Sequence, residues 1–174
     1  MKNLLTILLF LYSSHVLASP QQELNEGDHL NPAILDGLLV KPRKLSDYQG
    51  KPLVIIVWAS WCSHCREEMA SFIKLKQRFQ ARDFNIIGIS VDDDALLAQN
   101  FVKQSKLSFD NYIDKNVYLE NMLGAHTIPL TVLVDSKGLI LSKIYGSQKW
   151  DDNEHVHFIA KVLHLTPKQK SSDK

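Results

Sequence analysis

The sequence contains few of the residues that mark specialised proteins. Only two of its 174 residues are cysteine, which excludes a small scaffold stapled by several disulfides and a zinc site of four thiolates. Lys and Arg number 20 against 19 Asp and Glu, so there is no basic excess for binding nucleic acid. Hydrophobic residues make up 45% of the chain, which is too many for a disordered polymer. A globular chain of one domain remains.

The sequence also lacks an apolar run of the roughly 20 residues that a membrane-spanning helix needs. Its longest run, residues 4–12, follows the positive charge of Lys2 and precedes the short segment Val16-Leu17-Ala18. This pattern predicts a secretory signal peptide over residues 1–18, cleaved after Ala18. We therefore expect a periplasmic or otherwise secreted protein, in a compartment where disulfides persist. An uncleaved N-terminal anchor is the alternative.

The rest of the chain alternates between strand-like and helix-like patterns. Residues 19–33 are polar and aperiodic and predict a flexible leader, residues 166–174 predict a flexible tail, and the domain is expected over 34–165. Residues 53–58 are all apolar, which is typical of a strand buried on both faces, and residues 84–91 form a second such run. Apolar residues at helical spacing follow each run. This order predicts a parallel β–α–β unit.

Shorter elements are expected near both ends of the domain. The Asp-Gly dipeptide at 36–37 favours a tight hairpin turn between the apolar residues on either side. Residues 130–134 and 139–145 flank a short polar turn and predict an antiparallel hairpin. A last helix is expected to begin at Asp151 as N-cap, with Glu154 three residues later. The predicted fold is α/β, with one mixed sheet and helices on both faces.

The two cysteines lie where the first buried strand ends and a helix is expected to begin. Cys62 and Cys65 are separated by two residues in the segment WASWCSHC, so they can close a small disulfide ring. At a helix N-terminus, free N–H groups and the helix dipole favour a thiolate at Cys62, below the usual cysteine pKa of about 8.5. Cys65, one turn later, is placed to attack a mixed disulfide formed by Cys62. A zinc knuckle would need two more ligands at comparable spacing, and the sequence offers none as cysteines, so a redox pair is favoured over a metal site or a purely structural disulfide.

These residues resemble the thioredoxin-fold proteins and, more narrowly, the periplasmic TlpA/ResA group of thiol:disulfide oxidoreductases. The resemblance covers about residues 37–160 and rests on the WCxxC string and on Ile128-Pro129 before a later strand. It implies a thioredoxin-like fold, with a central mixed β-sheet flanked by helices and an N-terminal β-hairpin extension. It also implies an enzyme that exchanges disulfides with protein partners through a redox-active Cys62–Cys65 pair, with no other cofactor and no metal.

The resemblance assigns roles to neighbours of the cysteines. Pro129 corresponds to a family proline that is cis and lies against the CxxC pair, where it exposes the preceding backbone to an extended substrate segment. Glu68 corresponds to a carboxylate that influences thiol ionisation, although a solvated charge on the helix surface is an equal alternative. His64 is expected to stabilise the Cys62 thiolate, which makes the disulfide more oxidising. The residues expected to contact the partner protein are Trp61, Ser63 and Ile128.

One departure from the resemblance concerns proton transfer. Ile56 stands where cytoplasmic thioredoxin has a buried Asp that assists this step. Assistance would then have to come from Glu68, from the acidic residues 92–94 or from water.

The expected partners are protein thiols and disulfides together with a membrane electron donor or acceptor, and we expect a monomer. A reductant in cytochrome c or metalloprotein maturation is one role that the resemblance implies, whereas His64 favours oxidation, so the direction stays open. A copper-binding or chaperone-like module is an alternative, but copper relatives of this fold have two cysteines separated by three residues, one more than here, together with a distant His. A peroxiredoxin-type antioxidant is a weaker one, because it needs Thr at the position of Ala59.

Overall fold

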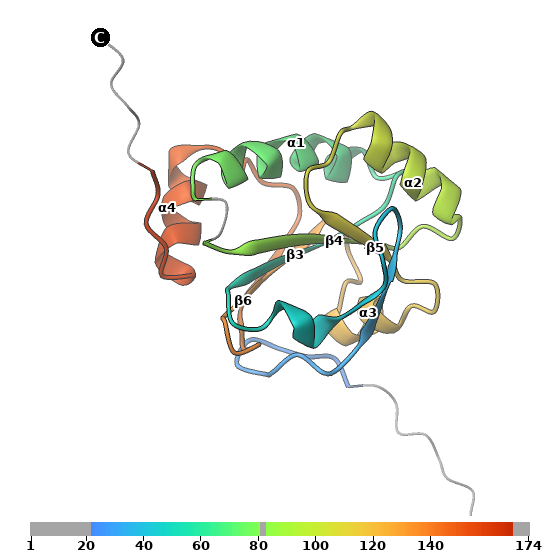
Figure 1. Cartoon of the computed structure of the whole chain (residues 1–174), viewed down its shortest axis with the longest axis horizontal. Coiled ribbons are helices and arrows are strands. Elements are labelled where there is room, and N and C mark those ends of the chain that lie inside the picture. Colours follow the sequence, from blue (N-terminus) through green and yellow to red (C-terminus); the bar gives the residue numbers. More distant parts are fainter. Residues whose placement is uncertain (1–21, 81–82, 169–174) are drawn as a thin grey trace, which may run out of the picture.

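The computed structural model describes residues 22–80 and 83–168, and its centre is a mixed β-sheet (Figure 1). Within these residues the sheet has seven strands in the order β2-β1-β5-β4-β3-β6-β7. The central strands β3, β4 and β5 are parallel, whereas β6 and β7 on one side and β1 and β2 on the other pair antiparallel. In chain order the strands are β1 (Ile34–Gly37), β2 (Arg43–Lys44), β3 (Leu53–Trp58), β4 (Asn85–Ser90), β5 (Asp110–Ile113), β6 (Leu130–Val134) and β7 (Ile140–Tyr145).

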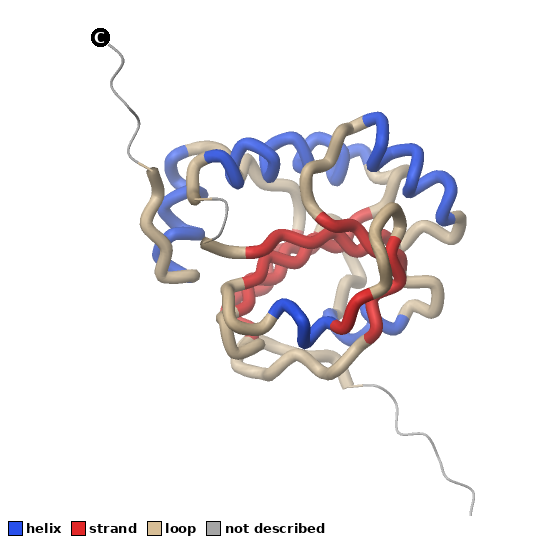
Figure 2. The backbone as a smooth tube through the Cα atoms, viewed as in Figure 1, coloured by secondary structure: helices blue, strands red, loops and turns tan. Residues whose placement is uncertain are grey.

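Helices cover both faces of the sheet (Figures 1 and 2). On one face lie α1 (Ser63–Gln77), α2 (Ala95–Gln104) and α4 (Asn153–Val162), and on the other lie α3 (Tyr118–Leu123) and the short 3-10 helix η1 (Leu45–Tyr48). None of the described helices is long and apolar enough to cross a membrane. The predicted thioredoxin-like arrangement of one mixed sheet between helices is confirmed.

The position of strand β3 between two cores explains why its sequence is apolar throughout. Its residues alternate between two cores, with Val54, Ile56 and Trp58 facing α1 and the other three facing α3. All six side chains are buried. A strand covered on both faces needs apolar residues at every position, so this strand could be recognised from the sequence alone.

The N-terminal hairpin is present, but its turn is not where the sequence predicts it. β1 and β2 pair antiparallel, whereas Asp36 and Gly37 lie inside β1, and Asp36 pairs with Ile113 of β5. The chain reverses over residues 38–42. A Cβ on Gly37 would lie 1.8 Å from the carbonyl oxygen of Val40, so this reversal itself requires glycine. Sheet pairing therefore overrides the local preference of Asp-Gly for a turn.

The predicted N-cap of the last helix is also wrong by one residue. Asp152 caps α4 by accepting a hydrogen bond from the backbone N–H of His155 at 2.8 Å. The carboxylate of Asp151 is instead 3.3 Å from the ammonium group of Lys74 on α1. Between the second helix and β6, the structure also contains β5 and α3, for which the sequence gave no expectation.

Residues 22–33, part of the expected flexible leader, are anchored to the domain. The backbone N–H of Leu24 donates to Met122 at 2.9 Å and that of Gly27 to Ile140 at 2.9 Å. Glu23 also forms an ion pair of 2.7 Å with Lys143. These contacts attach the segment to α3 and β7. The predicted signal peptide and its cleavage after Ala18 lie outside the described residues.

Candidate active site

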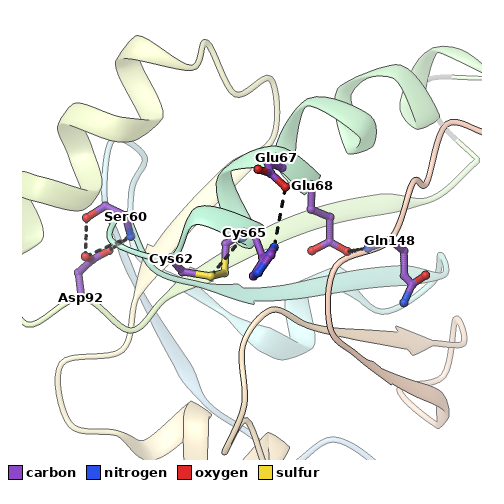
Figure 3. The surroundings of a disulfide bond; sticks show 8 residues. Ser60, Cys62, Cys65, Glu67, Glu68, Asp92 and Gln148 are labelled. Carbon is purple, nitrogen blue, oxygen red and sulfur yellow. Dashed lines mark hydrogen bonds and ion pairs between the residues drawn. A yellow bond between two sulfur atoms is a disulfide. The ribbon is translucent and has the colours of Figure 1, made fainter.

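The two cysteines form a disulfide at the N-terminus of α1, as the sequence predicts (Figure 3). Their Sγ atoms are joined at 2.16 Å and their Cα atoms lie 5.3 Å apart. Cys62 is the N-cap of the helix, and its sulfur accepts a hydrogen bond from the backbone N–H of Cys65 at 3.1 Å. The same N–H group and the positive end of the helix dipole stabilise negative charge on this sulfur when the pair is reduced.

The two cysteines differ in exposure. Cys62 keeps 8% of its surface exposed, whereas Cys65 is completely buried. Cys65 belongs to the core on the α1 face, with Met69 and Phe72 of the same helix. A sulfur atom from outside can therefore approach Cys62 and not Cys65.

The loop before β6 lies at the same edge of the sheet. Val57 pairs with Leu130, so Pro129 lies beyond the last paired residues of β3, where the chain continues to the cysteines. The Ile128–Pro129 peptide bond is cis, as the resemblance implies. Ile128 is partly buried and packs against the core that contains both cysteines.

Glu68 is buried one turn after Cys65, with only 2% of its surface exposed. Its Oε1 accepts a hydrogen bond from the backbone N–H of Gln148 at 3.3 Å (Figure 3). The same oxygen accepts a hydrogen bond from the indole N–H of Trp150. Its Oε2 has no hydrogen-bond partner among the described residues. Burial raises the pKa of Glu68 to about 7, although both hydrogen bonds oppose the change. The alternative of a solvated surface charge is therefore wrong.

The other predicted neighbours of the cysteines lie on the surface. Trp61 is 68% exposed directly before Cys62, and Ser63 is exposed directly after it. His64 is also exposed, and its Nδ1 lies 3.8 Å from the Glu67 carboxylate. The imidazole thus has an acidic partner on its own helix, a contact that the sequence analysis did not consider.

Two contacts near the cysteines were not predicted from the sequence. Ser60 and Asp92 are hydrogen bonded to each other, and each lies two residues after the end of a parallel strand. That shared position is a signal in the sequence, because the carboxyl ends of neighbouring parallel strands meet at one edge. Trp150 reaches Glu68 across 82 positions of the chain, and no local pattern predicts this contact.

The described residues contain no group of three His, Cys, Asp or Glu side chains that could hold a metal ion. Ile56 is completely buried in β3, so an apolar side chain does occupy that position.

Comparison with known proteins places the chain in a family. The model of the AhpC/TSA family matches residues 27–143, which is more than half of the chain. The chain belongs to the AhpC/TSA family. Among curated relatives, the thiol-disulfide oxidoreductase ResA of Bacillus cereus is 28% identical over 130 residues, 75% of each chain. ResA of Bacillus subtilis is 21% identical over 127 residues, 73% of this chain and 71% of that one.

Solved structures confirm the fold of this AhpC/TSA family member. The thioredoxin domain of a thiol-disulfide oxidoreductase from Bacteroides vulgatus matches with a TM-score of 0.70 at 21% identity, covering 81% of this chain and 99% of that one. A secreted disulfide oxidoreductase from Mycobacterium tuberculosis matches with a TM-score of 0.63 at 21% identity, covering 72% and 95%. With the Cys62–Cys65 pair and the ResA relatives, the chain is a thiol:disulfide oxidoreductase of thioredoxin-like fold.

Proposed function

We propose that this enzyme exchanges disulfides with protein partners outside the cytoplasm, with Cys62 as the attacking sulfur and Cys65 as the resolving sulfur. The observation that carries the proposal is the unequal placement of the two sulfurs. Cys62 is the partly exposed N-cap of α1, and Cys65 lies buried behind it. A nucleophile must reach its partner, whereas a resolving thiol must reach only Cys62.

The exchange conserves atoms and electrons. In the reducing direction the Cys62 thiolate attacks one sulfur of a partner disulfide, whose S–S bond breaks, and the other partner sulfur leaves as a thiolate. Cys65 releases its proton to solvent and attacks Cys62 Sγ, so the mixed disulfide breaks and the Cys62–Cys65 bond forms. The partner gains two electrons and the enzyme loses two. An external dithiol, supplied by a membrane electron donor, then reduces the enzyme again; the oxidising direction reverses every step.

The surrounding residues are proposed to guide the partner. Trp61 and Ser63 are exposed on either side of Cys62, so both are available for contact with a bound chain. Ile128 lies just before β6, at the edge of the sheet where β3 continues to the cysteines, which supports the proposal that an extended partner segment pairs with its backbone. Glu68 and His64 are proposed to influence thiol ionisation from the helix, Glu68 from inside the core and His64 from the surface.

Location outside the cytoplasm is supported by the signal-like residues 1–18 and by the match to a secreted mycobacterial oxidoreductase. In such a compartment the Cys62–Cys65 disulfide persists unless a dedicated donor reduces it. A monomer acting as a reductant in cytochrome c or metalloprotein maturation is the role we propose first.

Trapping of a mixed disulfide tests the assignment of the two cysteines. We expect the Cys65→Ala variant, incubated with a disulfide-linked model peptide, to retain the peptide covalently on Cys62, because no second thiol resolves the bond. The matched Cys62→Ala variant keeps only the buried sulfur and should retain little or none. Mass spectrometry without reductant detects the mixed disulfide between the peptide and the protein. Equal trapping by the two variants, or none by Cys65→Ala, contradicts the proposal.

The direction of electron flow is decided by the reduction potential of the Cys62–Cys65 couple. A potential near about −270 mV, like that of thioredoxin, supports a reductant. A potential near about −120 mV, like that of the oxidant DsbA, supports a disulfide donor instead. Equilibration with glutathione buffers, read by thiol alkylation, measures it.

A further inference from the structure

A hydrogen-bonded clamp ties the loop before Cys62 to the neighbouring strand (Figure 3). The carboxylate of Asp92, with 2% of its surface exposed, accepts the backbone N–H of Ser60 at 2.9 Å and the hydroxyl of Ser60 at 2.7 Å. The hydroxyl of buried Ser90 donates to the same carboxylate at 2.7 Å. We call these three residues the Ser60–Asp92 clamp. It satisfies a buried carboxylate whose desolvation would otherwise be costly.

The clamp lies between two fixed elements. Trp58 and Ser90 are the last paired residues of β3 and β4, so Ser60 and Asp92 each lie two residues beyond the sheet. On the other side, the backbone N–H of Cys62 donates to the carbonyl of Ala59 at 3.2 Å, and α1 begins at the next residue. The loop from 59 to 62 is therefore fixed by the strand, the helix and Asp92.

The neighbouring acidic residues do not share this role. Asp94 caps α2 by accepting the backbone N–H of Leu96 at 2.8 Å. Asp93 is exposed. Of the acidic residues 92–94, Asp92 is the one that accepts hydrogen bonds from Ser60 in the loop that carries the nucleophile.

We propose that Asp92 is a positioning residue for thiol–disulfide exchange. Through Ser60 it fixes Cys62 at the helix N-cap, where Sγ both accepts the N–H of Cys65 and stays accessible to a partner. The inference rests on the proposed function, because it concerns Cys62 as the attacking sulfur. Its chemical effect is on the ionisation and reactivity of that sulfur, since both depend on alignment with the helix N-terminus.

A role of Asp92 in positioning Cys62 and a purely electrostatic effect of its charge predict opposite changes in the reactivity of Cys62 when Asp92 is replaced by a neutral residue. A negative charge near a thiol disfavours the thiolate, so its loss alone would lower the pKa of Cys62 and speed its reaction at neutral pH. Loss of alignment would raise that pKa and slow the reaction. The Ser60→Ala substitution removes one hydrogen bond of the clamp and leaves the charge in place.

The experiment uses the full chain with Cys65→Ala, in which Cys62 is the single thiol. The alkylation rate of Cys62 by iodoacetamide is measured against pH for Asp92→Asn, for Ser60→Ala and for the control Asp93→Asn. We expect Asp92→Asn to slow alkylation at pH 7 roughly tenfold and to move the profile to higher pH, because misalignment of this kind weakens reactivity strongly. Ser60→Ala should act in the same direction with a smaller effect. Asp93→Asn should stay within about twofold, as an exposed substitution does.

Three results overturn the inference: an unchanged or faster rate in Asp92→Asn, an equal effect in Asp93→Asn, or no effect in Ser60→Ala. If Asp92→Asn does not fold, Ser60→Ala carries the test, since it keeps the other bonds of the clamp. The peptide-trapping experiment fails or succeeds independently of these rates. Trapping with unchanged alkylation rates contradicts the positioning role alone, and slower rates without trapping contradict the proposed function alone.

Discussion

Two buried carboxylates, one on each side of the disulfide, are treated differently by the fold. Asp92 lies two residues after β4 and contacts the loop before Cys62, and Glu68 lies after Cys65 on α1. Both side chains are 2% exposed. Asp92 receives donors on both oxygens, from Ser60 and Ser90, whereas among the described residues Glu68 receives donors on Oε1 alone.

The difference shows that burial alone does not decide what a carboxylate does. The hydrogen bonds to Asp92 come from the loop before Cys62 and from Ser90, so this contact serves to fix the loop. Glu68 has an unpaired Oε2 in the core, and burial raises its pKa to about 7, so it can hold a proton near neutral pH. One side of the disulfide therefore has a carboxylate that fixes a loop, and the other has a carboxyl group that titrates near pH 7.

The largest expected effect is on the Asp92 side. Asp92→Ala leaves two hydroxyls and one backbone N–H without their acceptor, and each buried unsatisfied group costs about 1–3 kcal/mol. We expect the free energy of unfolding of the oxidised protein to fall by about 4 kcal/mol. Urea unfolding at pH 7 measures it, and Asp93→Ala is the exposed control, expected within about 0.5 kcal/mol. A loss as small as that of the control would remove the distinction between the two sides.

The second expected effect is the dependence of stability on pH that Glu68 causes. Between pH 4.5 and about 7, Glu68 is protonated in the native state and ionised in the unfolded chain, so the native state binds more protons. Stability then falls as pH rises across this window, by about 3 kcal/mol in total. Glu68→Gln should remove that part of the slope, measured by urea unfolding of the oxidised protein at pH 4.5, 6 and 8.

Glu67→Gln is the matched control, because the same change of charge occurs one position away on the exposed face of α1. It should keep the slope of the native protein. If Glu68→Gln and the native protein lose stability in parallel between these pH values, the carboxyl is not protonated in the fold, and the two sides of the disulfide behave alike.

The contrast between local and distant partners also explains what the sequence could predict. Strand β3, the helix that starts after it and the Cys62–Cys65 pair were predicted correctly, because each depends on neighbours within a few residues. The turn at Asp36-Gly37 was wrong, because β5, far along the chain, pairs with these residues as a strand. A local preference decides only where no distant partner competes for the same backbone.

The features of the site likewise differ in whether they depend on nearby or on distant residues. Cys62 could be assigned to a helix N-cap from the chain order, and the cis bond at Pro129 followed from the resemblance. The environment of Glu68 could not be assigned, because its buried donor, Trp150, comes from a distant segment. The same holds for Asp152, which caps α4 while the expected cap, Asp151, pairs with Lys74. In each case one residue type has several uses, and tertiary packing selects among them.

The smallest expected effect concerns the donor that holds the Glu68 pKa down. Trp150→Phe keeps an aromatic ring against Phe72 but removes the indole N–H. Because the hydrogen bond from this N–H lowers the pKa of Glu68 in the native protein, its loss should raise that pKa. We expect the upper end of the pH window in which stability falls to rise by about one pH unit.

The packing cost of the smaller ring is the same at every pH, so it lowers the free energy of unfolding at every pH without moving the window. The double variant Glu68→Gln with Trp150→Phe should show no window at all. A window that persists in the double variant would assign the titration to a group other than Glu68, and one that does not move in Trp150→Phe would show that desolvation alone sets this carboxyl apart from Asp92.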